Sequence, residues 1–201
     1  MRLIVEELAH HFGDNPNLFE NLSFTIEPGE MVAITGSSGC GKSTLLSILV
    51  GWVAPSHGRV QREGGGKISW VFQNPLGSAK RSVLDHVVLP FLARGETRRN
   101  AEAESRQLLS RFNLTEQANY PYQTLSGGQA TRLMLARAFA TKPALLLVDE
   151  PTAQLDTHTA ATVNEVLSEL ASKNTVVVVA THDPDTAATC QRQINLKDYA
   201  E

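Results

Sequence analysis

Cysteine is scarce in this chain: the 201 residues include only Cys40 and Cys190, which stand far apart. Neither belongs to the close cysteine spacing of a structural metal site, so both are expected to be reduced, unpaired thiols. Long apolar runs are missing as well, and segments such as Val176–Ala180 are far too short to span a bilayer. Near the start, Glu6 and Glu7 stand where a secretory signal needs an uninterrupted apolar run. If the protein works at a membrane, another chain is expected to hold it there.

An excess of charge of one sign is also lacking. The 18 basic and 21 acidic side chains give a formal net charge of −3, so no broad basic surface and no nucleic-acid partner are expected. Apolar residues make up 42% of the chain, which is ordinary for a globular domain, and 201 residues are enough to bury one sizeable core. No internal repeat, low-complexity tract or long linker divides the sequence. Residues 1–201 are therefore predicted to form one domain.

Short apolar segments bounded by turn residues predict the strands, and apolar residues at helical spacing predict the helices. The expected strands are Leu3–Leu8, Leu22–Ile26, Met31–Thr35, Gly58–Gln61, Ile68–Phe72, Ala144–Val148 and Thr175–Ala180. The expected helices are Lys42–Val50, a helical region over residues 82–118 that includes Arg98–Phe112, then Gly127–Thr141 and Thr157–Ser172. The last two strands are continuous apolar runs separated by a helix, which indicates a parallel β-α-β unit. The sequence therefore predicts an α/β fold with a mostly parallel sheet.

A glycine-rich loop joins the third expected strand to the first expected helix. It reads Gly36-Ser37-Ser38-Gly39-Cys40-Gly41-Lys42-Ser43-Thr44 and fits the pattern G-x-x-x-x-G-K-[ST] without exception. The glycines allow backbone N–H groups to converge on phosphate oxygens, and the following helix offers its positive end to the anion. Lys42 is expected to reach the β- and γ-phosphates of ATP, and the Ser43 hydroxyl is expected to ligate Mg²⁺.

Two acids, Asp149 and Glu150, follow the apolar strand that ends at Val148. Ligands of open α/β sheets bind at the carboxyl ends of the strands, so both acids should face the crevice that holds the phosphate loop. Asp149 is expected to hold Mg²⁺. Glu150 is expected to lie beside the γ-phosphate and to orient or deprotonate the attacking water.

A second candidate anion site is the stretch Leu125-Ser126-Gly127-Gly128-Gln129, where a serine and two glycines precede a helix. One ATP does not need two such sites from one chain, so Ser126 is expected to serve the γ-phosphate bound to a second chain. Together with the phosphate loop and the pair Asp149-Glu150, this stretch closely resembles the nucleotide-binding domain of ATP-binding-cassette (ABC) proteins. The resemblance covers nearly the whole chain.

This resemblance implies the organisation of the molecule. A P-loop NTPase core with a small antiparallel β-subdomain would comprise residues 1–75 and 142–201. An α-helical subdomain would comprise residues 76–141 and would carry Leu125–Gln129, the signature motif of the family. Two copies would pair head to tail around ATP and Mg²⁺. The pair would drive an integral membrane permease subunit from the cytoplasmic face of the inner membrane, as a peripheral protein.

The resemblance also assigns roles to four further residues. Gln73 matches the family's glutamine loop, which contacts Mg²⁺ or water and senses the membrane partner. Asp156 matches the loop that contacts the second copy, and His182 matches the switch histidine at the γ-phosphate. Phe12 is expected to stack on adenine, with His11 as the alternative.

The chain departs from the family pattern in three places. Thr131 replaces a polar residue of the signature helix, and Ala153-Gln154 replaces the commoner Ser-Ala before Leu155. The interval from Lys42 to Gln73 is short, which suggests a trimmed antiparallel subdomain around Gly58–Lys67. Every residue needed for hydrolysis is kept.

Three functions fit these motifs: the ATPase of a transporter, a soluble ABC ATPase acting on DNA or ribosomes, and a module that transmits force through a membrane partner to control an extracytoplasmic enzyme. The second is disfavoured, because there is one cassette and no heptad run between the two motifs. The segments Val83–Pro90, Pro151–Asp156 and Thr181–Pro184 look most like the group that handles lipoprotein release, macrolide or haem export and cell division. An ATPase subunit of a transporter, most simply an exporter, is therefore expected.

Overall fold

The computed structural model describes residues 1–153, 155–172 and 174–200. Its centre is a five-stranded parallel sheet with the order β5-β6-β7-β3-β8. The strands are β3 (Met31–Thr35), β5 (Ile68–Val71), β6 (Leu145–Asp149), β7 (Val176–Thr181) and β8 (Arg192–Asn195). The parallel unit expected from the two apolar runs is confirmed, because β6 and β7 pair directly and the chain between them forms α5 (Thr157–Ser172).

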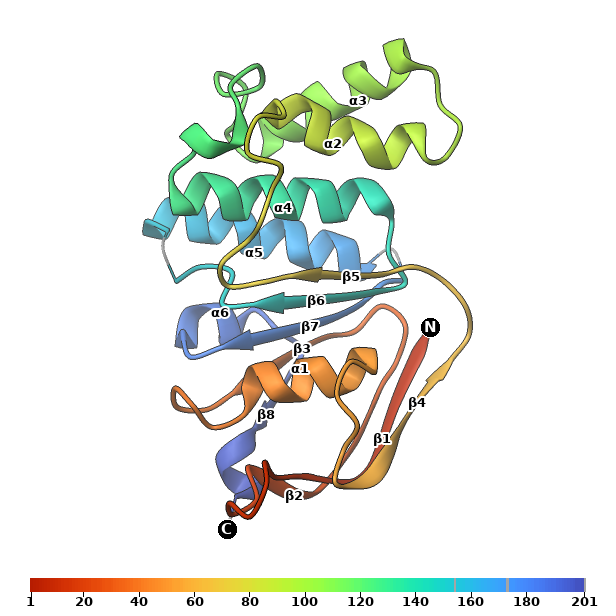
Figure 1. Cartoon of the computed structure of the whole chain (residues 1–201), viewed down its shortest axis with the longest axis vertical. Helices are drawn as coiled ribbons and strands as arrows, with labels where there is room; N and C mark the ends of the chain where they lie inside the picture. Colours follow the sequence, from red (N-terminus) through yellow and green to blue (C-terminus); the bar gives the residue numbers. More distant parts are fainter. Residues whose placement is uncertain (154, 173, 201) are drawn as a thin grey trace.

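The apolar strands of this sheet are buried on both faces because side chains alternate along a strand. Leu146 and Val148 pack into one core, whereas Leu145 and Leu147 pack into the other. The first core lies against α2, α3, α4 and α5, and the second lies against α1 and the antiparallel sheet. Figure 1 shows this sandwich, with the helical layer above the parallel sheet and the antiparallel strands below it.

The antiparallel sheet has three strands in the order β2-β1-β4: β1 (Arg2–His10), β2 (Phe19–Ile26) and β4 (His57–Glu63). A bulge in the pairing of β1 with β4 depends on Gly58, whose φ is +78°. A Cβ atom there would lie 2.4 Å from the carbonyl oxygens of Glu6 and Glu7, so only glycine fits. The expected small antiparallel unit is confirmed, together with the α/β fold class.

The helices are α1 (Lys42–Val50), α2 (Val83–Leu92), α3 (Arg98–Arg111), α4 (Gly127–Thr141), α5 (Thr157–Ser172) and the short α6 (Pro184–Ala188). Two 3₁₀ turns, η1 (Tyr122–Thr124) and η2 (Leu196–Tyr199), complete the elements. The bounds expected for α1, α4 and α5 are confirmed. The helical region over residues 82–118 is divided into α2 and α3, because Gly95 takes a φ of +86° and Thr97 caps a new helix.

Three details of the chain differ from expectation. Phe112 is the C-cap of α3 and not a helical residue, although its side chain is buried as expected. The helical spacing of the apolar residues in α4 predicts that Arg132 points outward, but its side chain is half-buried, and burial lowers the pKa of its guanidinium. Strand β8 and helix α6 were not anticipated. Within the described residues, no helix combines the length and apolar character needed to cross a bilayer.

Candidate functional site

The glycine-rich loop, residues 36–44, connects the end of β3 to the start of α1. Gly41 is the residue before the helix, and it has a φ of +98°. A Cβ atom at this position would lie 3.2 Å from Leu18 and 3.4 Å from Phe19, so both the backbone angle and the available space require glycine. The first N–H groups of α1 have no partner within the helix, and this loop directs them into the crevice.

Lys42 is the first residue of α1 and is buried. Its ammonium group donates to the carbonyl oxygens of Gly36, at 3.0 Å, and Ser37, at 3.3 Å. The carboxylate of Glu150 lies 3.6 Å away. A single buried cation is therefore held between the loop and the end of β6, in a position where phosphate oxygens would compete for it.

Ser43 and Asp149 meet across the site, since the Ser43 hydroxyl donates to Asp149 Oδ2 at 2.6 Å. Burial raises the pKa of Asp149 above its ordinary value, although the hydrogen bond from Ser43 opposes this shift. Among the described residues, no group of three or more His, Cys, Asp or Glu side chains could hold a metal ion by itself. One carboxylate and one hydroxyl fit Mg²⁺ that takes its other ligands from phosphate and water.

Glu150 lies one residue beyond β6, and its carboxylate is enclosed by the end of β7. Oε1 is 2.9 Å from His182 Nδ1, while Oε2 accepts from the Thr181 hydroxyl and the His182 backbone N–H, both at 3.3 Å. The Glu150 backbone has a φ of +50° and donates its N–H to Ala180 O at 2.8 Å. A non-glycine residue in this strained conformation persists only where its surroundings hold it.

These side chains open onto a cavity of about 600 Å³, which is large enough for a nucleotide. Its lining comprises Phe12, Leu18, Ser37, Ser38, Gly39, Gly41, Lys42, Ser43, Thr44, Gln73, Asp149, Glu150 and His182. The structure thus brings together the phosphate loop, both acids, the glutamine, the histidine and the aromatic residue. Among the described residues, Gly36 and Cys40 belong to the loop without lining this cavity.

Phe12 and His11 are the two candidates for stacking on adenine, and their surroundings differ. Phe12 lines the cavity with its ring edge-on to His10 at 4.7 Å. His11 is not among the lining residues, and its Nδ1 lies 2.7 Å from Gly13 O. Leu18, which no sequence pattern indicated, lines the same cavity and lies beside Gly41 of the loop. Its position just before a buried strand carries no signal of ligand contact.

The signature residues lie outside this cavity. Ser126 caps α4: its hydroxyl accepts from the Gln129 N–H at 3.3 Å, and its own N–H donates to Gln129 Oε1 at 2.9 Å. Gly127 and Gly128 form the first turn of the helix. Figure 1 shows the start of α4 on the same side of the molecule as the start of α1, but separated from it along the long axis.

Asp156 also lies outside the lining, at the start of α5. Its carboxylate accepts from the Thr159 hydroxyl at 2.7 Å and from the Thr159 N–H at 3.0 Å, and these bonds lower the pKa of Asp156. The side chain is exposed. Ala153 and Gln154 depart from the family pattern, and Gln154 lies outside the described residues.

Residues 19–153 match a family model described as ABC transporter. The chain belongs to the ABC transporter family. The lipoprotein-releasing system ATP-binding protein LolD of Granulibacter bethesdensis is 37% identical over 98% of this chain and 94% of that protein. The macrolide export ATP-binding/permease protein MacB of Chromobacterium violaceum is 35% identical over 92% of this chain and 31% of that protein.

A solved ATP-binding cassette, dimeric and in a post-hydrolysis state with ADP and Pi bound, has the same fold. Its TM-score is 0.86, with 29% identity over 98% of this chain and 94% of that chain. The suspected group is thereby confirmed, and this ABC protein is an ATP-binding subunit that hydrolyses ATP in a reaction coupled to transport.

Proposed function

We propose that this ABC ATPase works as a pair of identical subunits that drives a separate membrane subunit in the export or release of an amphiphilic substrate, such as a lipoprotein. The convergence of Lys42, Glu150 and His182 in one cavity, with Ser126 outside it, is the observation that carries the proposal. The likeness to a lipoprotein-releasing ATPase and a macrolide exporter supports the direction of transport.

Hydrolysis needs a base beside the γ-phosphate, and Glu150 is proposed as that base. It sits against the Lys42 ammonium and the His182 ring, so it can accept a proton from water while those groups face the phosphate. Lys42 binds the β- and γ-phosphates, and the loop N–H groups orient them. Phe12 contributes an aromatic face to adenine, and Gln73, which lines the same cavity, contacts the attacking water.

Mg²⁺ is proposed to bind at Ser43 and Asp149, with Gln73 as a further oxygen ligand. The fit rests on the contact between the Ser43 hydroxyl and the Asp149 carboxylate, which are hard oxygen donors. When bound, the ion would neutralise charge on the phosphates.

The second copy is proposed to complete the site. The Ser126 hydroxyl and the exposed N–H groups of Gly127 and Gly128 would contact the γ-phosphate held by the other chain, and Asp156 would contact its phosphate loop. The exposed positions of Ser126 and Asp156 support this arrangement, because neither side chain faces the cavity of its own chain.

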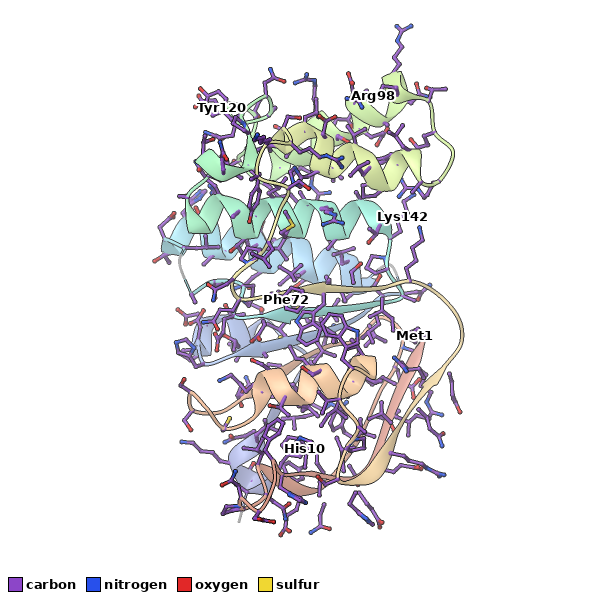
Figure 2. The ribbon with its side chains drawn as sticks, in the orientation of Figure 1. Met1, His10, Phe72, Arg98, Tyr120 and Lys142 are labelled. Carbon is purple, nitrogen blue, oxygen red and sulfur yellow. The ribbon has the colours of Figure 1, made fainter. Side chains whose placement is uncertain are left out.

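The membrane subunit is proposed to dock on a surface cluster of three aromatic rings, Trp52, Trp70 and Phe72. The Trp52 and Trp70 rings lie 5.0 Å apart and the Trp70 and Phe72 rings 4.7 Å apart. Trp52 is 68% exposed, and Leu76, four positions after Phe72 in the chain, is 86% exposed. Phe72, which Figure 2 labels beside the parallel sheet, is followed in the chain by Gln73, which lines the cavity. A partner that displaces the aromatic cluster would therefore also displace a residue of the proposed site.

Co-purification of the native complex, with the membrane subunit identified by mass, tests the proposal. Trp52→Glu should lose the partner while keeping ATP binding. Tyr120→Glu is the matched control, because Tyr120 is 55% exposed and lies at the far end of the helical layer (Figure 2). In proteoliposomes, the complex should release a lipid-anchored protein only with hydrolysable ATP. Activation of an extracytoplasmic enzyme without release would instead support the force-transmitting alternative.

A further inference from the structure

The turns that follow β6 and β7 are joined at a second place, two residues beyond Glu150. Thr152 is buried, and its hydroxyl donates to Asp183 Oδ2 at 3.1 Å and lies 2.9 Å from the Thr186 hydroxyl. Neither residue lines the cavity that holds the phosphate loop, as far as the described residues extend. The contact therefore has no direct part in binding the nucleotide, although Thr152 is two residues from Glu150 and Asp183 adjoins His182.

The Asp183 carboxylate is the centre of this contact. It accepts from the Thr186 hydroxyl at 2.6 Å and from the backbone N–H groups of Asp185 and Thr186 at 3.1 and 3.3 Å, so it caps α6. Burial by itself would raise the pKa of Asp183, but these donors and Thr152 hold the pKa below its ordinary value. A charged, fully partnered acceptor is a rigid attachment point.

The network extends to α5 through Asn164, whose side-chain N–H donates to the Thr186 hydroxyl at 3.3 Å. Asn164 and Thr186 are both buried. The turn after β7 is thus fixed to α6 and to α5. Thr152 attaches the turn after β6 to this fixed group.

The turn after β6 needs side-chain contacts to fix it, because its backbone hydrogen bonding to the sheet ends at Glu150. Among the described residues, the bond from the Glu150 N–H to Ala180 O is the last backbone bond between this segment and β7. The φ of +50° at Glu150 is strained, and a release of the following segment would let the carboxylate rotate away from His182.

We propose that Thr152 and Asp183 are positioning residues for ATP hydrolysis: their hydrogen bond fixes the turn after β6 against the turn after β7, and so keeps the Glu150 carboxylate against His182. The proposal rests on the roles proposed above for Glu150 and His182. An error of about 1 Å in the place of a catalytic group costs up to about 10²-fold in rate.

The test first compares ATP turnover by the purified full-length chain in three single variants. Thr152→Val removes the hydroxyl at constant shape and should lower kcat at least tenfold, with KM for ATP within twofold of wild type. Thr152→Ser restores the donor and should restore kcat. Thr175→Val is the matched control: Thr175 is equally buried, donates to Pro143 O at 2.8 Å, and lies six positions from Thr181, about 20 Å along β7. It should lower the melting temperature about as much as Thr152→Val and leave kcat unchanged.

A double variant separates positioning from a general loss of structure. If Thr152 acts through the Glu150–His182 contact, Thr152→Val should change kcat little once His182→Ala has removed that contact. Wild-type turnover in Thr152→Val, equal losses in Thr152→Val and Thr175→Val, or full additivity with His182→Ala would each overturn the proposal. If Thr152→Val does not fold, Thr152→Ala serves in its place.

Glu150→Gln distinguishes a wrong assignment of the base from a wrong assignment of the positioning residues. If it keeps wild-type turnover, the base has been assigned wrongly and the proposed function loses its mechanism. If it is inactive while Thr152→Val turns over normally, only the positioning role fails.

Discussion

Replacing Glu150 with glutamine is the sharpest test of the site, because it removes one charge and almost no volume. General-base catalysis contributes about 10²–10⁴-fold, so kcat should fall by about 10²-fold or more, equivalent to a barrier about 2.7 kcal/mol higher. The amide oxygen can still accept from Thr181 and the His182 N–H, so the turn should keep its conformation.

The same substitution should also affect the affinity for ATP. The Lys42 and Glu150 charges lie 3.6 Å apart in a buried site, and at an effective dielectric constant of about 20 they attract by about 5 kcal/mol before desolvation is counted. A neutral glutamine releases the Lys42 ammonium to the phosphates. The dissociation constant for ATP should therefore stay unchanged or fall.

The assays are phosphate release at saturating ATP, titration with a fluorescent ATP analogue, and size-exclusion chromatography with ATP and Mg²⁺. Glu150→Gln should retain ATP and elute as a dimer. Glu165→Gln, an exposed position on α5, makes the identical chemical change away from the cavity and should behave as wild type. Turnover within a few-fold of wild type would remove Glu150 from its role, and weaker ATP binding would refute the electrostatic reasoning about Lys42.

Three further outcomes are expected. Ser126→Arg should abolish hydrolysis yet leave ATP binding to the monomer intact, as equilibrium titration would show; failed monomer binding would disprove the second-copy assignment. Folding raises the pKa of Asp149 above its ordinary value of 3.8, so the folded chain favours the protonated carboxyl. The stability that this preference contributes is fully present below pH 3.8 and is lost as the pH rises through the raised pKa. Urea unfolding without Mg²⁺ should show this loss in wild type and not in Asp149→Asn, whereas parallel pH curves would contradict it. Gly58→Ala should cost about 3 kcal/mol of stability by the same measurement, because its φ is +78° and its Cβ would strike the Glu6 carbonyl, while Gly65→Ala, with open space around it, should cost little.

The phosphate loop and the acid pair could be placed from the sequence because their geometry is local. Residues 36–44 are contiguous, so the pattern itself fixes which backbone groups converge. Asp149 and Glu150 follow a continuous apolar strand, and the rule that ligands bind at the carboxyl ends of parallel strands brings them to the loop. The Ser43–Asp149 contact joins residues 106 positions apart and still follows from that rule.

Other parts of the site depend on contacts that no local pattern specifies. Leu18 reaches the cavity because β2 packs beneath Gly41, and the role of Thr181 depends on where the Glu150 carboxylate turns. Strand β8, with the sequence Arg-Gln-Ile-Asn, is a polar edge strand that pairs on one side only, so it lacks the apolar run that identifies β6 and β7. Arg132 is half-buried for a similar reason: helical periodicity finds the apolar face of α4 but cannot show what covers its flank.

Each half of the proposed site is already assembled within one chain, and this bears on the control of hydrolysis. Glu150, the proposed base, already contacts Lys42, Thr181 and His182, so its surroundings are assembled within one chain. Ser126 is also fixed, by its reciprocal bonds with Gln129, and the N–H groups of Gly127 and Gly128 have no partner within the helix. In the proposed dimer neither half needs to refold. Closure would supply only the donors that stabilise charge on the γ-phosphate, and such preorganised electrostatic groups provide the largest share of many rate enhancements. Hydrolysis would then be limited by the approach of the second copy, which is the step that a membrane subunit bound at Trp52 and Phe72 could regulate.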